Sequence, residues 1–300
     1  MAIATTAVIG LGSMGYGMAR SLLRAGHRVH GFDVAADREA AFRAEGGAEG
    51  PVGEIAGTLD AVVIVVLNAA QTEAVLFGAD GVVPRLRPGA VVLASATVPP
   101  AFARAMEARC AEHSVLYLDA PISGGAAKAD QGQLSVMASG TNAAFAAARP
   151  ALDAMATTVF ELGNGAGPGS AMKAVNQMLA GVHIAMMGEA LSFGMTQGIT
   201  PAQFLEVMSQ CAGSSWMLEN RAPHVVAGDY TPLSQIAIWP KDLGIVLDTA
   251  KAAGFSVPIT AAAMQQYMVA MGMGLAREDD AAITKVYARN VGLALPCEGS

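Results

Sequence analysis

The chain has 300 residues, of which 53% are hydrophobic and 14% are charged, and its formal net charge is −7. This length is enough for one large or two ordinary domains with a substantial core. The negative charge argues against nucleic acid as a partner, because phosphate binding requires a basic surface.

The first predicted elements form a strand–loop–helix unit. A short apolar strand, Ala7–Ile9, leads into the sequence GLGSMG, and a helical pattern follows over Tyr16–Ala25. A second predicted strand begins at Arg28 and ends at Asp33, which lies 18 residues after the last glycine of the loop. A GxGxxG pattern in this context indicates a dinucleotide-binding unit.

Each glycine of this loop has a distinct predicted role. Gly10 permits the tight turn, Gly12 lets the pyrophosphate approach the backbone, and Gly15 lets the helix pack closely on the strand. The start of the following helix then faces the phosphates. We expect the Asp33 carboxylate to bond the adenosine ribose and to repel a 2′-phosphate, which favours NAD over NADP. Arg38 lies nearby in the sequence and could weaken this preference.

Further strands are predicted at 61–67, 90–93 and 115–119, and the first of these is a continuous apolar run. Continuous apolar runs are typical of strands buried on both faces of a parallel sheet, so we predict a doubly wound α/β Rossmann domain. Ligands bind beyond the carboxyl ends of such strands, which nominates Leu67, Asn68 and Thr97 as cofactor contacts. For Asn68 and for Thr97, simple capping of a turn is an equally good interpretation.

A different kind of site is predicted after the strand at 115–119. Ser123, Gly124 and Gly125 would expose successive backbone N–H groups, and such a concavity binds anions without a charged side chain. A substrate carboxylate is the expected occupant. The alternative is a flexible turn with no ligand.

The glycine-rich segment from Gly163 to Gly169 marks the predicted domain boundary. We therefore predict an NAD-binding domain over residues 1–164 and a domain for substrate binding and oligomerisation over residues 165–300. Strand patterns are absent after the boundary, and helices are predicted at 170–197, 201–210, 242–253, 259–271 and 279–291. The second domain should therefore be all-helical.

The long helix that opens the second half carries the main catalytic candidate. Lys173 lies in an almost wholly apolar stretch, and burial lowers the pKa of a lysine, so this residue could exchange protons near neutral pH. Asn176 lies one turn further on the same face. His183 shares roughly that face, although a packed histidine is the more common outcome.

Polar residues later in the chain receive weaker predictions. Lys241 could reach the cofactor or could be a solvated lysine, and Asp242 is expected to favour the helix N-terminus at which it stands. Asn220 and Arg221 are assigned a structural role in preference to substrate contact. The acidic run 278–280 is interpreted as a solvated helix start.

Other features exclude several classes of protein. The three cysteines, Cys110, Cys211 and Cys297, lie far apart and offer no spacing for a metal site, so we expect reduced thiols, no metal and a cytoplasmic location. The N-terminus lacks the charge and apolar pattern of a signal peptide. The apolar run from Met178 to Met195 is too short and too polar for a membrane span, so a buried helix is expected.

Four stretches of the chain are similar to one known family, the β-hydroxyacid dehydrogenases, which include 3-hydroxyisobutyrate dehydrogenase and tartronate semialdehyde reductase. These stretches are residues 10–19, 119–125, 167–176 and 241–244, and they occur in the order of the family. Residues 190–194, 219–221 and 241–248 most resemble the bacterial L-threonate dehydrogenases. The chain departs from the family pattern at Ala96, where serine is frequent, and at Pro240, where another residue is expected.

The resemblance implies a Rossmann domain, a long interdomain helix and a helical domain that forms dimers or tetramers. It implies NAD-linked oxidation of a small hydroxy acid, with L-threonate as the first candidate, and Lys173 as the catalytic acid and base. Tartronate semialdehyde reductase and 3-hydroxyisobutyrate dehydrogenase are the alternatives, and a non-catalytic dinucleotide-binding protein is a third. The implied substrate contacts are Ser123, Gly124, Gly125 and Asn176. The predicted cofactor contacts are Gly10, Leu11, Gly12, Ser13, Met14, Gly15, Asp33, Leu67, Asn68, Thr97 and Lys241.

Overall fold

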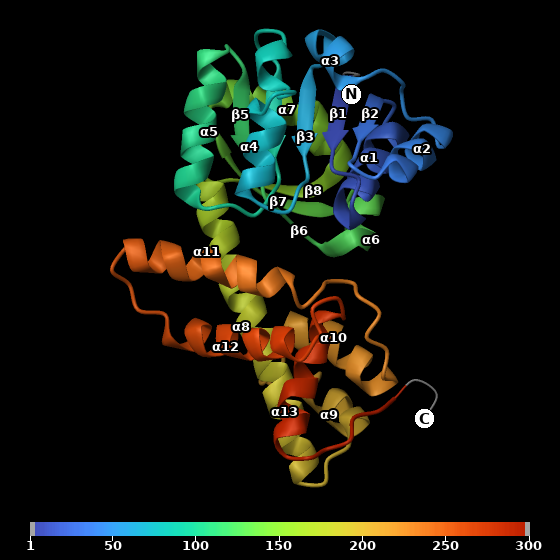
Figure 1. Ribbon diagram of the computed structural model, residues 1–300, viewed down its shortest axis with the longest axis vertical. Coiled ribbons are helices and arrows are strands. Elements are labelled where there is room, and N and C mark those ends of the chain that lie inside the picture. Colours follow the sequence, from blue (N-terminus) through green and yellow to red (C-terminus); the bar gives the residue numbers. More distant parts are fainter. Residues whose placement is uncertain (1–3, 298–300) are drawn as a thin grey trace. The chain divides into compact units, whose positions relative to one another are not determined.

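The computed structural model describes residues 4–297 and divides the chain into two compact units, residues 1–173 and residues 174–300 (Figure 1). The first unit contains a sheet covered by helices, and the second is built from helices. This arrangement confirms the predicted fold class of a Rossmann domain followed by a helical domain. Each unit is described by itself below.

The sheet of the first unit has the strand order β2-β1-β3-β4-β5-β7-β6, and β8 pairs with β7. Strands β1 to β5 run parallel, whereas β7 is antiparallel to β5 and to β6. The chain leaves β1 towards β2 on one side and returns to β3 on the other, which creates a topological switch point between β1 and β3. The strands are β1 Thr5–Ile9, β2 Arg28–Phe32, β3 Ala61–Ile64, β4 Val91–Ala94, β5 Leu116–Asp119, β6 Ile122–Ser123, β7 Leu134–Gly140 and β8 Ala156–Glu161.

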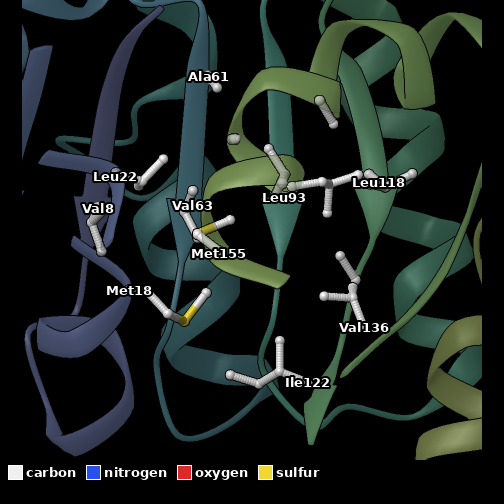
Figure 2. Close-up of a cluster of buried hydrophobic side chains, with 14 of the residues drawn as sticks. Val8, Met18, Leu22, Ala61, Val63, Leu93, Leu118, Ile122, Val136 and Met155 are labelled. Atoms are coloured by element: carbon white, nitrogen blue, oxygen red, sulfur yellow. The ribbon is translucent and has the colours of Figure 1, made fainter. Parts of the chain in front are cut away.

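Helices cover both faces of this sheet because successive strand residues point to opposite sides. On one face, Val63 and Leu93 pack with Met18 of α1 and Met155 of α7 (Figure 2). On the other face, their neighbours Val62 and Val92 join side chains of α4 and α5 in a second core. The helices of this unit are α1 Ser13–Arg24, α2 Ala36–Ala44, α3 Val52–Ile55, α4 Ala69–Phe77, α5 Pro100–Glu112, α6 Gly125–Gln131 and α7 Asn142–Met155, with short 3-10 turns at Ala56–Thr58 and Val83–Arg85.

The second unit is a helical bundle with its own core, in which Tyr267 of α12 is fully buried. Close packing depends on Gly181 of α8, since a Cβ there would lie 2.9 Å from the Leu243 side chain and from the ring of Trp239 in α11. Within the described part of this unit, the only β pairing is an isolated bridge between Gln235 and Asp279. The helices are α8 Pro168–Thr196, which begins in the first unit, α9 Pro201–Met208, α10 Trp216–Ala227, α11 Ile238–Ala252, α12 Pro258–Gly272 and α13 Thr284–Asn290, with a 3-10 turn at Asp280–Ile283.

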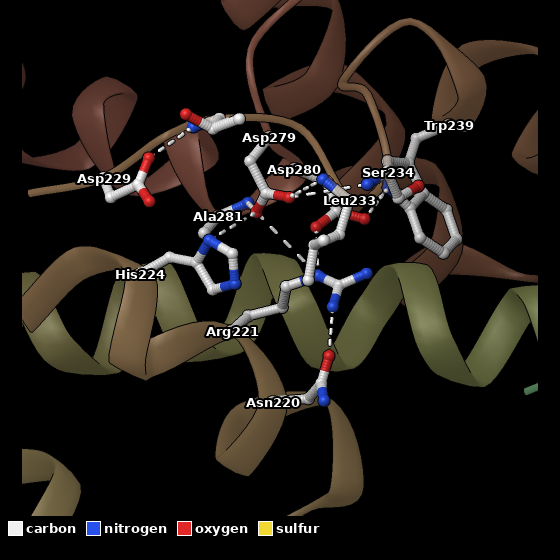
Figure 3. A network of polar contacts seen from close by, with 11 residues as sticks. Asn220, Arg221, His224, Asp229, Leu233, Ser234, Trp239, Asp279, Asp280 and Ala281 are labelled. Carbon is white, nitrogen blue, oxygen red and sulfur yellow. Dashed lines mark hydrogen bonds and ion pairs between the residues drawn. The ribbon is translucent and has the colours of Figure 1, made fainter. Parts of the chain in front are cut away.

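The acidic run 278–280 corrects one prediction, because two of its three carboxylates are not solvated. Asp279 and Asp280 are fully buried and pair with Arg221 of α10, which is itself only 7% exposed (Figure 3). Asp280 also accepts a hydrogen bond from the Trp239 indole over 3.0 Å. Arg221 therefore has the structural role that was favoured for it, and its guanidinium also bonds Asn220.

Helix α8 is long and apolar enough, by length and composition, to cross a membrane. In the structure, 44% of its most apolar 18-residue stretch is buried. The core helix of a soluble protein can have the same length and composition. Ile184, Met187 and Leu191 of this helix lie in the core of the second unit. The helix is therefore packed in the core along one side, as expected, whereas Val175, Leu179, Met186 and Phe193 on another side are more than half exposed.

Candidate functional site

The loop after β1 has the geometry that the three glycines predicted. Gly10 has φ +99°, and a Cβ there would lie 2.3 Å from the carbonyl oxygen of Val65. A Cβ at Gly15 would lie 1.8 Å from the carbonyl oxygen of Gly10, so the helix can approach the strand only without a side chain. At Gly12 no atom lies within 4 Å of the Cβ position. The loop is closed around Gly10 and Gly15 and open at Gly12, as a dinucleotide pyrophosphate requires.

The start of α1 is also suited to phosphate. Gly12 occupies the N-cap position of α1 and, having no side chain, provides no capping hydrogen bond to the first turn. Free N–H groups and the helix dipole at such a terminus favour a phosphate group. The residues of this loop therefore fit the pyrophosphate of NAD.

Asp33 lies beside this loop, one residue beyond β2. Its Oδ2 accepts a hydrogen bond from the Leu11 N–H over 2.6 Å, and its Oδ1 accepts one from the Ala35 N–H over 2.9 Å. Arg38 of α2 donates from Nη1 to the Leu11 carbonyl oxygen over 2.6 Å. The carboxylate and the guanidinium thus both border the same loop, at the position where an adenosine ribose is bound in Rossmann domains.

The segment after β3 lies at the switch point. Leu67 is 63% exposed, and the Asn68 side chain caps α4 by accepting a hydrogen bond from the Gln71 N–H over 2.9 Å. The capping interpretation of Asn68 is therefore correct, and a cofactor contact there stays a prediction. Thr97 follows β4 and is half-buried. β3 itself ends at Ile64, three residues earlier than predicted.

A second polar region forms where β5 gives way to β6 and α6. Gly124 has φ +140° and Gly125 has φ +80°, conformations that favour glycine, so the backbone turns sharply after Ser123. The Lys173 ammonium donates a hydrogen bond to the carbonyl oxygen of Ile122 over 2.9 Å. The structure therefore brings Lys173 to the residue that directly precedes the predicted anion-binding segment, although 50 residues separate them in the chain.

Asp119, at the end of β5, holds the start of α8 in the first unit. It is fully buried and accepts hydrogen bonds from the backbone N–H groups of Gly167 (3.0 Å) and Ser170 (2.8 Å) and from the hydroxyl of Ser170 (2.7 Å). Ser139 of β7 accepts a bond from the Gly169 N–H over 2.9 Å. Burial raises the pKa of Asp119, and these donors counteract the shift. This role of Asp119 was not predicted from the sequence, although an acid at the end of a buried strand was a usable signal.

In the second unit, four polar side chains form one chain of contacts from α8 to α11. Asn176 donates from Nδ2 to Gln177 Oε1 over 2.9 Å, Gln177 donates from Nε2 to Asp242 Oδ2, and the Lys241 ammonium pairs with Asp242 Oδ1. Asp242 is 2% exposed. The prediction that Asp242 stands at a helix N-terminus is wrong, because α11 begins at Ile238 and Pro240 is tolerated in its first turn. The Asp242 carboxylate instead links Gln177 of α8 to Lys241 of α11.

Within residues 4–297, no group of three or more histidine, cysteine, aspartate or glutamate side chains is arranged to hold a metal ion.

The protein has a Rossmann domain with an open glycine loop and a helical unit, and the helix that joins them carries a half-buried lysine. These features together define an NAD-binding oxidoreductase. Two family models match the chain: the NAD-binding domain of 6-phosphogluconate dehydrogenase over residues 5–163, and the NAD-binding domain of NADP-dependent 3-hydroxyisobutyrate dehydrogenase over residues 167–287. The chain belongs to the 3-hydroxyisobutyrate dehydrogenase family. It is a dehydrogenase that uses NAD.

Relatives and a solved structure agree with this assignment over nearly the full chain. L-threonate dehydrogenase of Cupriavidus necator is 48% identical over 96% of this chain and 97% of its own. L-threonate dehydrogenase of Escherichia coli is 42% identical over 96% and 95%. A crystal structure described as 3-hydroxyisobutyrate dehydrogenase from Salmonella typhimurium has a TM-score of 0.89 and 45% identity, covering 94% of this chain and 99% of that chain.

Proposed function

We propose that this protein oxidises a small hydroxy acid with NAD, that L-threonate is the substrate, and that Lys173 is the general acid and base. The observation that carries the proposal is the position of the Lys173 ammonium at the Ile122 carbonyl, next to Ser123, Gly124 and Gly125. The similarity to L-threonate dehydrogenases supports the substrate. The product would be 2-dehydro-L-erythronate.

The residues of this chain would act as follows. The substrate carboxylate docks on the N–H groups of Ser123 to Gly125, and Asn176 holds the acid beside Lys173. Lys173, in its neutral form, takes the proton of the reacting hydroxyl and returns it in the reverse reaction. When bound, NAD supplies the acceptor for the hydride that leaves the carbinol carbon. The remaining proposed cofactor contacts are Gly10 to Gly15, Asp33, Leu67, Asn68, Thr97 and Lys241.

We also infer the assignment of the two domains, the cofactor preference and the setting of the enzyme. Residues 1–164 would bind NAD, and residues 165–300 would bind substrate and mediate oligomerisation. The position of the Asp33 carboxylate at the Leu11 N–H supports NAD over NADP. The cysteine usage and the character of the relatives as bacterial metabolic dehydrogenases support a cytoplasmic location.

A homodimer or homotetramer is supported by one face of α8. Val175, Leu179, Met186 and Phe193 recur along this helix at intervals of four and seven residues, and each is between 51% and 66% exposed. An apolar stripe with this period is suited to pairing with another helix. Light scattering after gel filtration would test the assignment, and a monomer at micromolar concentration would refute it.

The test of the function compares substrates and one lysine variant. NADH formation is followed with L-threonate, D-threonate, L-erythronate, D-glycerate, 3-hydroxyisobutyrate and 4-hydroxybutyrate. Lys173→Ala should lower kcat by roughly 10² to 10⁴ while NADH binding persists. Lys251→Ala, at an exposed position in the last turn of α11, is the matched control and should keep full activity.

Each outcome of this test has a definite meaning. Preference for L-threonate supports the substrate assignment, whereas preference for 3-hydroxyisobutyrate would favour the description of the similar Salmonella typhimurium structure. Reduction of tartronate semialdehyde with NADH, without oxidation of these acids, would favour the reductase. Near-normal turnover in Lys173→Ala would remove the assigned role of the lysine. Silence with every substrate, while NADH still binds, would favour a non-catalytic dinucleotide-binding protein.

A further inference from the structure

The chain of contacts Asn176–Gln177–Asp242–Lys241 has a fixed direction of hydrogen bonding. The buried Asp242 carboxylate lies against the Lys241 ammonium, and an ionised carboxylate can only accept hydrogen bonds. The Gln177 side chain must therefore turn its NH₂ group towards Asp242, which leaves its carbonyl oxygen for Asn176. Asn176 in turn must give one N–H to that oxygen.

This direction determines what the half-buried Asn176 can offer to a ligand. Because its NH₂ group is turned towards Gln177, its carbonyl oxygen lies on the opposite side of the amide. A carbonyl oxygen accepts a hydrogen bond from a hydroxyl group and repels a carboxylate. A reversed amide would present an NH₂ group there and would suit an acid with fewer hydroxyls equally well.

We propose that Asp242, acting through Gln177, orients the Asn176 carbonyl to accept a hydrogen bond from a substrate hydroxyl other than the reacting one. Asp242 and Gln177 are then positioning residues that select polyhydroxylated acids. This inference rests on the proposed function, since it assumes that Asn176 contacts the hydroxy acid. L-threonate carries hydroxyls beyond the reacting one, whereas 3-hydroxyisobutyrate carries a methyl group and a single hydroxyl.

The buried position of Asp242 strengthens the argument. A buried carboxylate is costly unless it is paired, and Asp242 has one hydrogen-bond donor, Gln177, and one ion-pair partner, the Lys241 ammonium. Rotation of the Gln177 amide would place its carbonyl oxygen against this carboxylate, so the alternative orientation is excluded as long as Asp242 is charged. An amide pair without such an acid could adopt either direction.

The experiment changes the direction of hydrogen bonding among these four side chains while keeping the size of each substituted side chain nearly the same. Asp242→Asn places an amide next to Gln177 and permits both orientations, and Gln177→Glu places two carboxylates face to face. The double variant Asp242→Asn/Gln177→Glu lets the new amide at position 242 donate to the new carboxylate at position 177. That carboxylate again accepts from Asn176, so the original orientation returns.

The readout is the ratio of kcat/KM for L-threonate to kcat/KM for 3-hydroxyisobutyrate. If 3-hydroxyisobutyrate is not oxidised, the reciprocal of its inhibition constant replaces its kcat/KM in this ratio. Each single variant should lower this preference about tenfold, as expected for loss of a specific hydrogen bond to a substrate hydroxyl, and the double variant should restore most of it. Glu206→Gln removes one exposed negative charge in the same unit and should leave the ratio unchanged. Circular dichroism and NADH binding verify folding of each variant.

Two results would overturn the inference while leaving the proposed function intact. One is an unchanged substrate preference in single variants that are folded and active. If such a variant changes only the KM for NAD, the role of Asp242 is limited to holding Lys241. The other is a double variant no better than the single ones. If the unmodified protein oxidises none of the hydroxy acids, the proposed function fails and the inference falls with it.

Discussion

Replacement of Arg221 by methionine tests whether the buried network of the second unit is as costly to break as its geometry indicates. The guanidinium lies against Asp280 and 3.9 Å from Asp279, and the side chains are 9% and 0% exposed (Figure 3). Asp279 keeps bonds from the N–H groups of Leu233 and Ala281 after the change. Methionine preserves most of the volume but leaves two adjacent buried carboxylates without their shared cation.

The expected loss of unfolding free energy is about 3–5 kcal/mol, the range for removal of one partner from a buried ion pair. Arg149→Met is the matched control, because Arg149 also has two carboxylate partners, Glu161 at 2.8 Å and Asp153 at 3.9 Å, but its side chain is 45% exposed. An exposed pair contributes about 0–1 kcal/mol. The two variants make the same chemical change, so burial accounts for the difference.

The loss should also depend on pH, with a sign that follows from Asp280. Burial raises the pKa of Asp280, and the charge of Arg221 pulls it back towards its ordinary value. A carboxyl with a raised folded pKa loses stability as the pH rises from its unfolded pKa to its folded pKa. Without Arg221 the pKa rises further, so the deficit of the variant should be smallest in acid and should grow towards neutral pH.

Denaturant unfolding followed by tryptophan fluorescence measures this directly, because both tryptophans of the chain, Trp216 and Trp239, lie in the second unit. Circular dichroism follows the control, since Arg149 lies in the first unit. A loss below about 1 kcal/mol in Arg221→Met, or a loss equal to that of Arg149→Met, would refute the reasoning. A deficit that is largest in acid would refute the assigned charge state of the two carboxylates.

Two further predictions concern the cofactor loop. The Gly12→Ala variant should fold normally, because the added Cβ meets no atom within 4 Å, but it should bind NADH more weakly in a fluorescence titration. The Gly15→Ala variant should unfold at a lower temperature, because the added Cβ would lie 1.8 Å from the Gly10 carbonyl oxygen. Equal effects on binding and melting in both variants would contradict the separate roles of these glycines. Asp33→Ala should lower kcat/KM for NAD and raise it for NADP, with Arg38 available to the added phosphate, and an unchanged ratio would contradict the proposed ribose contact.

The parts of the fold that could be predicted are those with a strong local pattern. The strands predicted at 61–67, 90–93 and 115–119 correspond to β3, β4 and β5, and almost all residues of these three strands are buried. The strands β7 and β8 were not predicted, since β7 contains small and polar residues and β8 is largely exposed along its length. The helix Trp216–Ala227 was also missed, because Pro223 lies inside it. Tertiary packing, rather than local periodicity, determines these elements.

The same distinction applies to the site. The glycine loop could be predicted because the spacing of its glycines, directly after a strand and before a helix, is a recognisable local pattern. Gly10 and Gly15 of this loop stand where a Cβ would clash. The interactions of Asp242 and Asp280 could not, because each depends on partners 65 and 59 residues away along the chain. An acid at an exposed helix start and an acid buried against an arginine have the same local sequence.

Three buried carboxylates each hold a helix or side chain close to a proposed site residue, and in this way they connect the fold to the proposed chemistry. Asp119 fixes the first turn of α8, five residues before Lys173 reaches the Ile122 carbonyl, and Asp280 bonds the Trp239 indole at the start of α11, two residues before Lys241. Asp242 then orients the amides that follow Lys173 on α8. A buried carboxylate is costly unless its donors are held in place, so each one penalises displacement of the element that supplies them. The stability of each unit and the orientation of its proposed site residues therefore depend on the same bonds.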